Sequence, residues 1–147
     1  CKKVIKNKLL ILRLSNVIGY EIGNKKKSSL MSIIIKSYKK KKIFFDYNYI
    51  LKKDFLPIKH LCLCIEKLIQ KKNYGIVNVG TGIPVTVKEF IKNIVDLSKV
   101  DIVTNLKNNI NDNHFCYKLN KFEKLTKIKI NKKKLFRYFY NLKRKIN

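Results

Sequence analysis

The sequence predicts an α/β fold in which short buried strands alternate with amphipathic helices. Short, mostly apolar runs, such as the one at 9–14, are typical of strands buried on both faces of a parallel sheet. Longer segments between these runs place apolar residues at helical spacing. With 147 residues and 46% hydrophobic residues, the chain has enough apolar material for one folded unit. We therefore expect a single domain over 1–147.

The first part of the chain predicts strand, helix and two strands. Residues 8–14 read Lys-Leu-Leu-Ile-Leu-Arg-Leu, which predicts the first strand, and the polar residues and glycine at 15–19 predict a turn. Apolar spacing predicts a helix from Ser28 or Ser29 to Tyr38. Short strands are predicted at 43–45 and 49–51.

The middle of the chain repeats the order helix, strand, loop and helix. Residues 61–72 have helical apolar spacing, and 76–80 form a short apolar run that predicts a strand. After a loop at 81–84, Thr86 and Glu89 have the spacing of a capping box. In that motif the hydroxyl accepts from the third helical amide and the carboxylate reaches back to the cap. We expect a helix from this point to about residue 97.

The last third predicts one strand and two helices. A strand is expected at 100–104, an Asn-rich loop at 105–114 and a short helix at 120–126. Asn131 is expected to cap a final helix. One side of that helix carries Leu135, Phe139, Leu142 and Ile146.

The charge is the most extreme feature of the composition. Lys and Arg number 35 against 9 Asp and Glu, which gives a formal net charge of +26. This balance suits a binder of nucleic acid or of an anionic membrane. However, most of these cations are lysines in scattered short runs, as at solvated helix ends and loops, and lysine codons are rich in A and T. We keep a small basic binding module as an alternative, and a non-functional gene remnant as another, but do not favour nucleic acid as a partner.

The sequence contains neither an apolar run of the ~18 residues that a membrane-spanning helix needs nor an apolar signal core. We therefore expect no transmembrane segment and a cytoplasmic location. Cys62 and Cys64 lack a C-x-x-C partner pair, and His60 and His114 have no partner at metal or triad spacing. We expect reduced cysteines and no metal site.

Three motifs occur in a fixed order along the first two thirds of the chain. They are Arg-Leu-Ser-Asn-Val-Ile-Gly at 13–19, Lys-Asp-Phe-Leu-Pro-Ile at 53–58, and Gly-Ile-Val-Asn-Val-Gly-Thr-Gly at 75–82 followed by Thr-Val-Lys-Glu-Phe at 86–90. In order and approximate spacing they resemble the C-terminal half of NAD-dependent nucleotide-sugar epimerases and dehydratases, the extended short-chain dehydrogenases/reductases. The resemblance covers about residues 9–98, and the tail matches only loosely. It implies the C-terminal portion of a Rossmann-type fold, with the last sheet strands, a small mixed substrate-binding lobe and C-terminal helices.

The resemblance also implies roles for the turn after the first strand. Asn16 looks like a hydrogen-bonding contact to a nucleotide-sugar, and an amide suits this work because it both donates and accepts. Ser15 and Val17 look like neighbours of the nicotinamide of NAD or NADP. Tyr20 stands where the family usually has proline.

Lys53 falls where the family usually has an arginine that approaches the substrate diphosphate, with Asp54 beside it as a structural acid. A lysine supplies a point charge in place of a planar fork. Asn78 and the Gly-Thr-Gly loop at 80–82 resemble the family's second substrate-side strand and loop. His60 stands where the family commonly has aspartate.

Residues 1–147 contain no match to the family's Gly-rich phosphate turn or to its catalytic Tyr-x-x-x-Lys pair, which in the family lies before the Arg-x-x-Asn turn. Three pairs have the Tyr-x-x-x-Lys spacing, but they follow the Arg-x-x-Asn turn, and about 1.7 such pairs are expected at random from this composition. We expect no catalytic residue within 1–147 and a dinucleotide-binding domain outside it. The chain alone is then inactive, while the full-length enzyme binds a nucleotide-sugar and forms a homodimer as family members often do. The rejected pairs are Tyr38/Lys42, Tyr49/Lys53 and Tyr117/Lys121.

Overall fold

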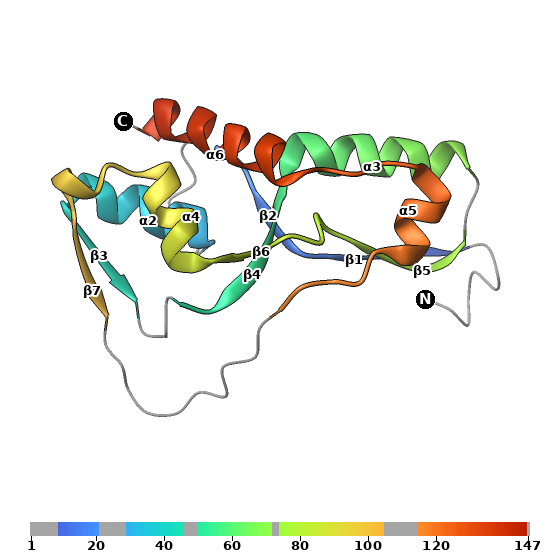
Figure 1. Cartoon of the computed structure of the whole chain (residues 1–147), viewed down its shortest axis with the longest axis horizontal. Helices are drawn as coiled ribbons and strands as arrows, with labels where there is room; N and C mark the ends of the chain where they lie inside the picture. The colour runs from blue at the N-terminus through green and yellow to red at the C-terminus, as the bar shows by residue number, and fades with distance from the viewer. Residues whose placement is uncertain (1–8, 21–28, 46–49, 72–73, 105–114, 147) are drawn as a thin grey trace.

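Strands from distant parts of the sequence pair with each other in this computed structural model. The structure describes residues 9–20, 29–45, 50–71, 74–104 and 115–146. Within these residues the strands form three small sheets, which follow one another along the long axis of the molecule (Figure 1). The α/β class predicted from the sequence is confirmed.

The first sheet pairs β1 (Leu10–Leu14) in parallel with β5 (Gly75–Val79). The register sets Leu10 opposite Gly75 and Leu14 opposite Val79. The helices α3 (Ile58–Gln70) and α5 (Asn120–Thr126) pack near this sheet. Both predicted strands and the short helix are confirmed, while α3 begins three residues earlier than the apolar spacing predicts.

The second sheet has the order β2 (Asn16–Ile18), β4 (Lys52–Pro57) and β6 (Pro84–Thr86). β2 lies parallel to β4, and β6 runs antiparallel to it. The predicted turn at 15–19 is wrong over 16–18, because this stretch stays extended and pairs with β4. The strand predicted at 49–51 is also misplaced: residue 49 lies outside the described residues, and the strand starts at Lys52.

The third sheet pairs β3 (Lys42–Phe45) in parallel with β7 (Asp101–Thr104). The helix α2 (Leu30–Lys39) precedes β3, and the Ser29 hydroxyl accepts a hydrogen bond from the Ser32 amide at its start. Lys41 has a φ of 56°, and this left-handed residue turns the chain from the helix into the strand. These three elements agree with the sequence prediction.

Two helices start at the predicted caps. The Thr86 hydroxyl accepts from the Glu89 amide at 3.0 Å and starts α4 (Val87–Ile94). The Glu89 carboxylate lies 3.8 Å from the Lys132 ammonium at the start of α6 (Lys132–Ile146). α4 ends three residues before the predicted end, and the 3-10 turn η1 (Leu97–Lys99) follows it.

The Asn131 side chain caps α6, since its Oδ1 accepts from the Lys134 amide at 2.8 Å. The predicted apolar side of this helix is confirmed, because Leu135, Phe139 and Leu142 are buried.

Buried side chains form two separate hydrophobic clusters. The aromatic cluster is centred on three packed rings contributed by β4, α4 and α6; the aliphatic cluster joins β5 to α3 and α5. The buried members of the aromatic cluster are Ile18, Met31, Ile34, Ile43, Phe55, Val85, Val87, Phe90, Ile91, Ile94, Val95, Val100, Leu135, Phe139 and Leu142. Those of the aliphatic cluster are Leu56, Leu61, Cys64, Leu68, Val77, Val79, Leu119 and Phe122.

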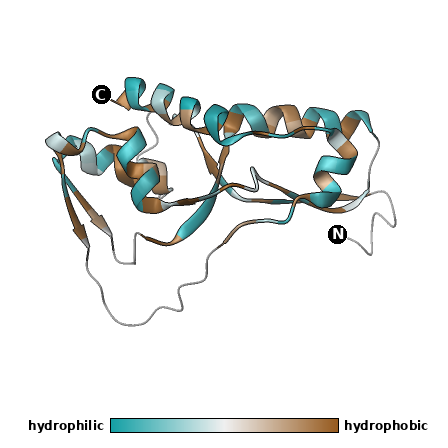
Figure 2. Ribbon diagram, viewed as in Figure 1, coloured by the Kyte–Doolittle hydropathy of each residue, from teal (hydrophilic) through white to brown (hydrophobic). Residues whose placement is uncertain are grey.

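The two long helices α3 and α6 follow each other along one edge of the molecule, with β3 and β7 at one end and β1 and β5 toward the other (Figure 1). Hydrophilic and hydrophobic residues alternate along both helices, as expected when one side of each faces the clusters (Figure 2). Among the described helices, none combines the length and apolar character required to cross a bilayer.

Candidate functional site

A buried carboxylate joins the first two sheets. The Asp54 side chain, on β4, is fully buried and accepts hydrogen bonds from the loop between β5 and β6. Its Oδ1 accepts from the Thr81 amide at 2.9 Å and from the Thr81 hydroxyl at 2.7 Å, while its Oδ2 accepts from the Gly82 amide at 3.0 Å. The Ser15 hydroxyl donates to Oδ1 at 3.3 Å. This Asp54 junction therefore ties together the segment 15–17, β4 and the β5–β6 loop.

Two glycines are required at the junction. A side chain on Gly80 would place its Cβ 2.5 Å from Asp54 Oδ2, closer than real contacts allow. Gly82 has a φ of +68°, which a residue with a side chain rarely adopts. The Gly-Thr-Gly sequence thus serves to let backbone amides approach a carboxylate.

The segment 15–17, where β1 passes through Ser15 into β2, carries three predicted site residues in different environments. Ser15 is buried, its amide donates to the Val79 carbonyl at 3.0 Å, and its hydroxyl faces Asp54. Asn16 is exposed, and its Nδ2 donates to the Asp54 backbone carbonyl at 3.1 Å. Val17 is 38% exposed. Asn16 and Val17 are therefore the residues of this segment that a ligand can reach.

Lys53 lies near Asn16, and Asn78 lies in a different sheet. Lys53 precedes Asp54 on β4, and the strand register pairs Asn16 with Phe55, two residues farther along β4. Lys53 is half-buried and forms no ion pair with a carboxylate of the described residues. Asn78 is half-buried on β5, where it pairs with Arg13 of β1. Sequence alone does not predict this separation.

Two aromatic residues that the sequence does not predict as site residues lie next to this region. Phe115 forms a bridge with Lys53, and its amide donates to the Lys52 carbonyl at 3.0 Å. The Phe115 and Tyr117 rings are 4.7 Å apart in an edge-on arrangement, and the Tyr117 hydroxyl donates to the Leu14 carbonyl at 3.4 Å. The only sequence signal was their alternation with polar residues after the Asn-rich loop.

Burial perturbs the titratable groups around the junction. The pKa of His60 is lowered, chiefly because burial disfavours its charged form; Asp54 opposes this shift and Lys134 adds to it. Burial and the nearby Asp54 raise the pKa of the Cys116 thiol, which lies 3.9 Å from Asp54 Oδ2. Burial raises the pKa of Cys64 to about 12. Both thiols are therefore disfavoured as nucleophiles, since the thiolate is the reactive form.

The arrangement can hold a ligand through an exposed amide, an ammonium group and apolar surface. Asn16 and Lys53 lie where β1 ends and β4 begins, beside exposed Val17 and Phe115. In α/β sheets, ligands bind outside the carboxyl ends of parallel strands, and the ends of β1 and β5 meet at this point. His114 and residues 105–113 lie outside the described part of the chain.

Comparison with solved structures gives strong matches of fold. The chain aligns with UDP-N-acetylglucosamine 4-epimerase from Methanobrevibacter ruminantium, solved with UDP-N-acetylmuramic acid, at a TM-score of 0.76 and 16% identity over 97% of this chain and 47% of that one. It aligns with dTDP-glucose 4,6-dehydratase from Bacillus anthracis, solved with NAD, at a TM-score of 0.67 and 16% identity over 92% of this chain and 44% of that one. It aligns with RMD from Pseudomonas aeruginosa, solved with NADPH, at a TM-score of 0.67 and 16% identity over 94% of this chain and 48% of that one.

No protein-family model matches the sequence, and no curated protein sequence is significantly similar to it. The chain spans about half the length of the solved structures that it matches. The fold expected from the three sequence motifs is confirmed. The chain has an α/β fold that matches about 45% of the length of Rossmann-type NAD-dependent epimerases and dehydratases.

Proposed function

We propose that this chain is the substrate-binding part of an NAD(P)-dependent nucleotide-sugar epimerase, dehydratase or reductase that acts in the synthesis of glycan or polysaccharide precursors. The observation that carries the proposal is the placement of Asn16 and Lys53 on adjacent strands, beside the ends of β1 and β5. The fold matches support it, since they include enzymes solved with a nucleotide-sugar or with a nicotinamide cofactor.

In this proposal each accessible residue has a separate task. The Lys53 ammonium attracts the substrate diphosphate, and the Asn16 amide orients the sugar through one further hydrogen bond. Asn78, in the neighbouring sheet, approaches the same substrate from β5. The exposed Phe115 ring provides apolar surface next to Lys53. Holding the sugar in one orientation lowers the entropic cost of the reaction that follows.

The nicotinamide cofactor, NAD or NADP, would exchange a hydride with the sugar: it would take one and return it in an epimerase or dehydratase, and its reduced form would deliver one in a reductase. The residues of the segment 15–17 fit a contact at the edge of such a group. Val17 offers an exposed apolar side chain, whereas the Ser15 hydroxyl faces Asp54, so Ser15 would contribute through its backbone. We propose that the main cofactor site and the catalytic pair belong to a domain outside 1–147, that the full-length enzyme is a cytoplasmic homodimer, and that these residues alone do not catalyse.

Binding of UDP-N-acetylglucosamine to the 147-residue chain tests the proposal. Lys53→Gln should weaken binding about tenfold, the effect of one charged hydrogen bond, and Asn16→Ala by a smaller factor. Lys53→Arg should retain or strengthen binding, because a guanidinium can engage a phosphate through two parallel hydrogen bonds. Calorimetry with Lys124→Gln on α5 as the control measures these effects. Equal affinity in the Lys53→Gln and Lys124→Gln variants would contradict the assignment of Lys53.

The mass of the native gene product tests the proposal that another domain is present. Immunoprecipitation followed by intact mass spectrometry should give a species of about twice the 17.4 kDa of this chain. A native product of 17.4 kDa would contradict the two-domain proposal unless a separate chain supplies the cofactor site.

A further inference from the structure

A basic hollow lies between α6 and the start of α3. Its volume is about 620 Å³, within the range of small-ligand sites. The parallel strands β2 and β4 begin near Asn16 and Lys53. The hollow lies beyond the opposite, carboxyl ends of these two strands. The hollow is therefore separate from the nucleotide-sugar site proposed above. Its lining residues are Tyr20, Ile58, Lys59, Tyr138, Asn141, Leu142, Arg144 and Lys145.

Packing and hydrogen bonds fix the inner wall of this hollow. The Tyr138 hydroxyl donates to the Ile18 carbonyl at 3.1 Å and is hydrogen-bonded to the Ile58 backbone. A Cβ on Gly19 would lie 3.0 Å from Ile58 Cγ2, so the chain leaving β2 packs closely against the first turn of α3. Leu142 is only 4% exposed and belongs to the aromatic cluster. A ligand would therefore meet a preformed surface.

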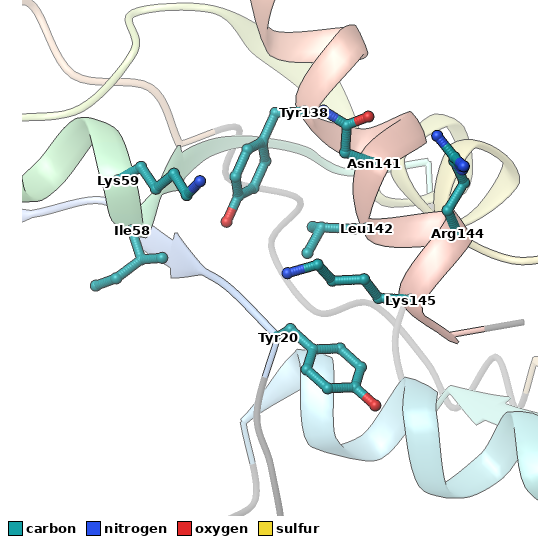
Figure 3. A pocket seen from close by; sticks show the side chains of 8 residues that line it. All are labelled: Tyr20, Ile58, Lys59, Tyr138, Asn141, Leu142, Arg144 and Lys145. Atoms are coloured by element: carbon teal, nitrogen blue, oxygen red, sulfur yellow. The ribbon is translucent and has the colours of Figure 1, made fainter.

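The lining residues include three cations and no carboxylate. Figure 3 shows the ammonium groups of Lys59 and Lys145 directed from opposite sides toward the space beside Tyr138, with Arg144 one residue before Lys145 on α6. The Lys145 Nζ also lies 5.9 Å from the centre of the Tyr20 ring. These cations are exposed, and none forms an ion pair within the described residues.

A second basic hollow, beside α5, provides a contrast. Its lining includes Lys124, Lys127 and Lys129, but also Glu123, whose carboxylate lies 2.9 Å from the Lys129 ammonium. Positive charge there is partly balanced within the protein. In the hollow beside α6, no carboxylate of the described residues balances the like charges, and an anion between them would remove their repulsion.

We propose that the hollow between α6 and α3 binds a small phosphate-bearing anion with at least two negative charges. Phosphate oxygens can accept hydrogen bonds from the Lys59 and Lys145 ammonium groups at once, whereas the Arg144 guanidinium points away from this space (Figure 3) and adds only positive charge nearby. The exposed apolar side chain of Ile58 suits a short organic substituent on the phosphate. The ligand class is therefore a phosphate ester or a diphosphate of small-molecule size.

Titration of the 147-residue chain with inorganic pyrophosphate tests this proposal. The double substitution Lys59→Gln with Lys145→Gln should weaken binding about tenfold or more. The matched control, Lys124→Gln with Lys127→Gln, removes the same charge from the hollow beside α5 and should change affinity less than about twofold. Calorimetry measures both affinities, and circular dichroism checks that both variants keep the fold.

Amide NMR of the unsubstituted chain provides a second measurement that does not depend on any variant. Pyrophosphate should shift the amides of residues 138–145 and of Lys59 before those of other basic segments. Three results would overturn the proposal: equal weakening in the two double variants, shifts spread over all lysine-rich segments, or binding of single-stranded DNA without binding of pyrophosphate.

Discussion

The two hydrophobic clusters differ in composition and in the length of sequence from which their buried members come, 18–142 for the aromatic cluster and 56–122 for the aliphatic cluster. In the aromatic cluster, the Phe55 and Phe90 rings stack with centroids 4.1 Å apart, and Phe139 contacts Phe90 edge-on at 5.0 Å. The aliphatic cluster consists mainly of Leu and Val side chains from β5 and α3. Neighbouring residues of β4 enter different clusters, Phe55 the aromatic and Leu56 the aliphatic. One strand therefore forms the partition between two cores.

Asp54 comes immediately before Phe55 and Leu56 on β4, so the Asp54 junction lies next to the strand that separates the two clusters. It connects β4 to the loop that leaves the aliphatic cluster at β5 and enters the aromatic cluster at β6. Buried polar groups of this kind stabilise a protein only while each donor keeps its acceptor. The junction is therefore the most sensitive part of the fold.

Asp54→Asn should lower the stability of both clusters at once. The asparagine keeps one acceptor oxygen, so its NH2 group would face either the Thr81 or the Gly82 amide with a donor in place of an acceptor. We expect the free energy of unfolding to fall by about 3 kcal/mol or more. Urea unfolding followed by circular dichroism measures the loss. Asp101→Asn, at an exposed position of β7, is the matched control and should leave the midpoint nearly unchanged. Similar midpoints for both variants would show that the junction does not stabilise the fold.

Phe139→Ala and Leu68→Ala compare the two clusters directly. We expect losses of about 3 to 5 kcal/mol for Phe139→Ala and about 2 to 5 kcal/mol for Leu68→Ala, with the former larger because it removes a ring from the aromatic contacts. If the junction couples the clusters, each substitution also lowers hydrogen-exchange protection in the other cluster. Protection lost only around the substituted residue would mean that the clusters unfold independently.

His60→Gln should have a smaller effect that depends on pH. Because the pKa of His60 is lowered in the folded state, the unfolded chain binds a proton first as the pH falls. The associated stability is present above the unfolded value of 6.5 and is lost as the pH falls through the folded value. His60→Gln should therefore flatten the dependence of urea midpoints on pH between about pH 7 and pH 5. Lys134→Gln, which removes a neighbouring positive charge, should weaken the same dependence, and an unchanged slope in both variants would contradict this explanation.

Local patterns were sufficient to predict most helices and the strands at 10–14, 42–45, 75–79 and 101–104, since their apolar periodicity matches what is buried. They failed for β2, whose polar start at Asn16 is typical of a turn; only pairing with β4 keeps it extended. They also failed to place β4, because its partners are distant in sequence. Long-range pairing cannot be read from a local window.

The site shows the same limit. The three motifs indicated Asn16, Lys53 and Asp54, and the structure places them together, but their roles stay predictions. Sequence did not indicate that Phe115 would lie beside Lys53, because that contact joins segments about sixty residues apart and rests on a bridge between strands. It also gave no sign that Tyr138 and Tyr20 would border one hollow.

Ser15 has a further consequence for any ligand that reaches Asn16. It is the single residue between β1 and β2, and its amide and hydroxyl are bonded to two other segments. The chain therefore cannot bend freely at this point, and the Asn16 amide is already held by the Asp54 carbonyl before a ligand arrives. Little conformational entropy remains to be lost there on association, so selectivity at Asn16 should come from rejecting ligands of the wrong shape, with little adjustment of the protein.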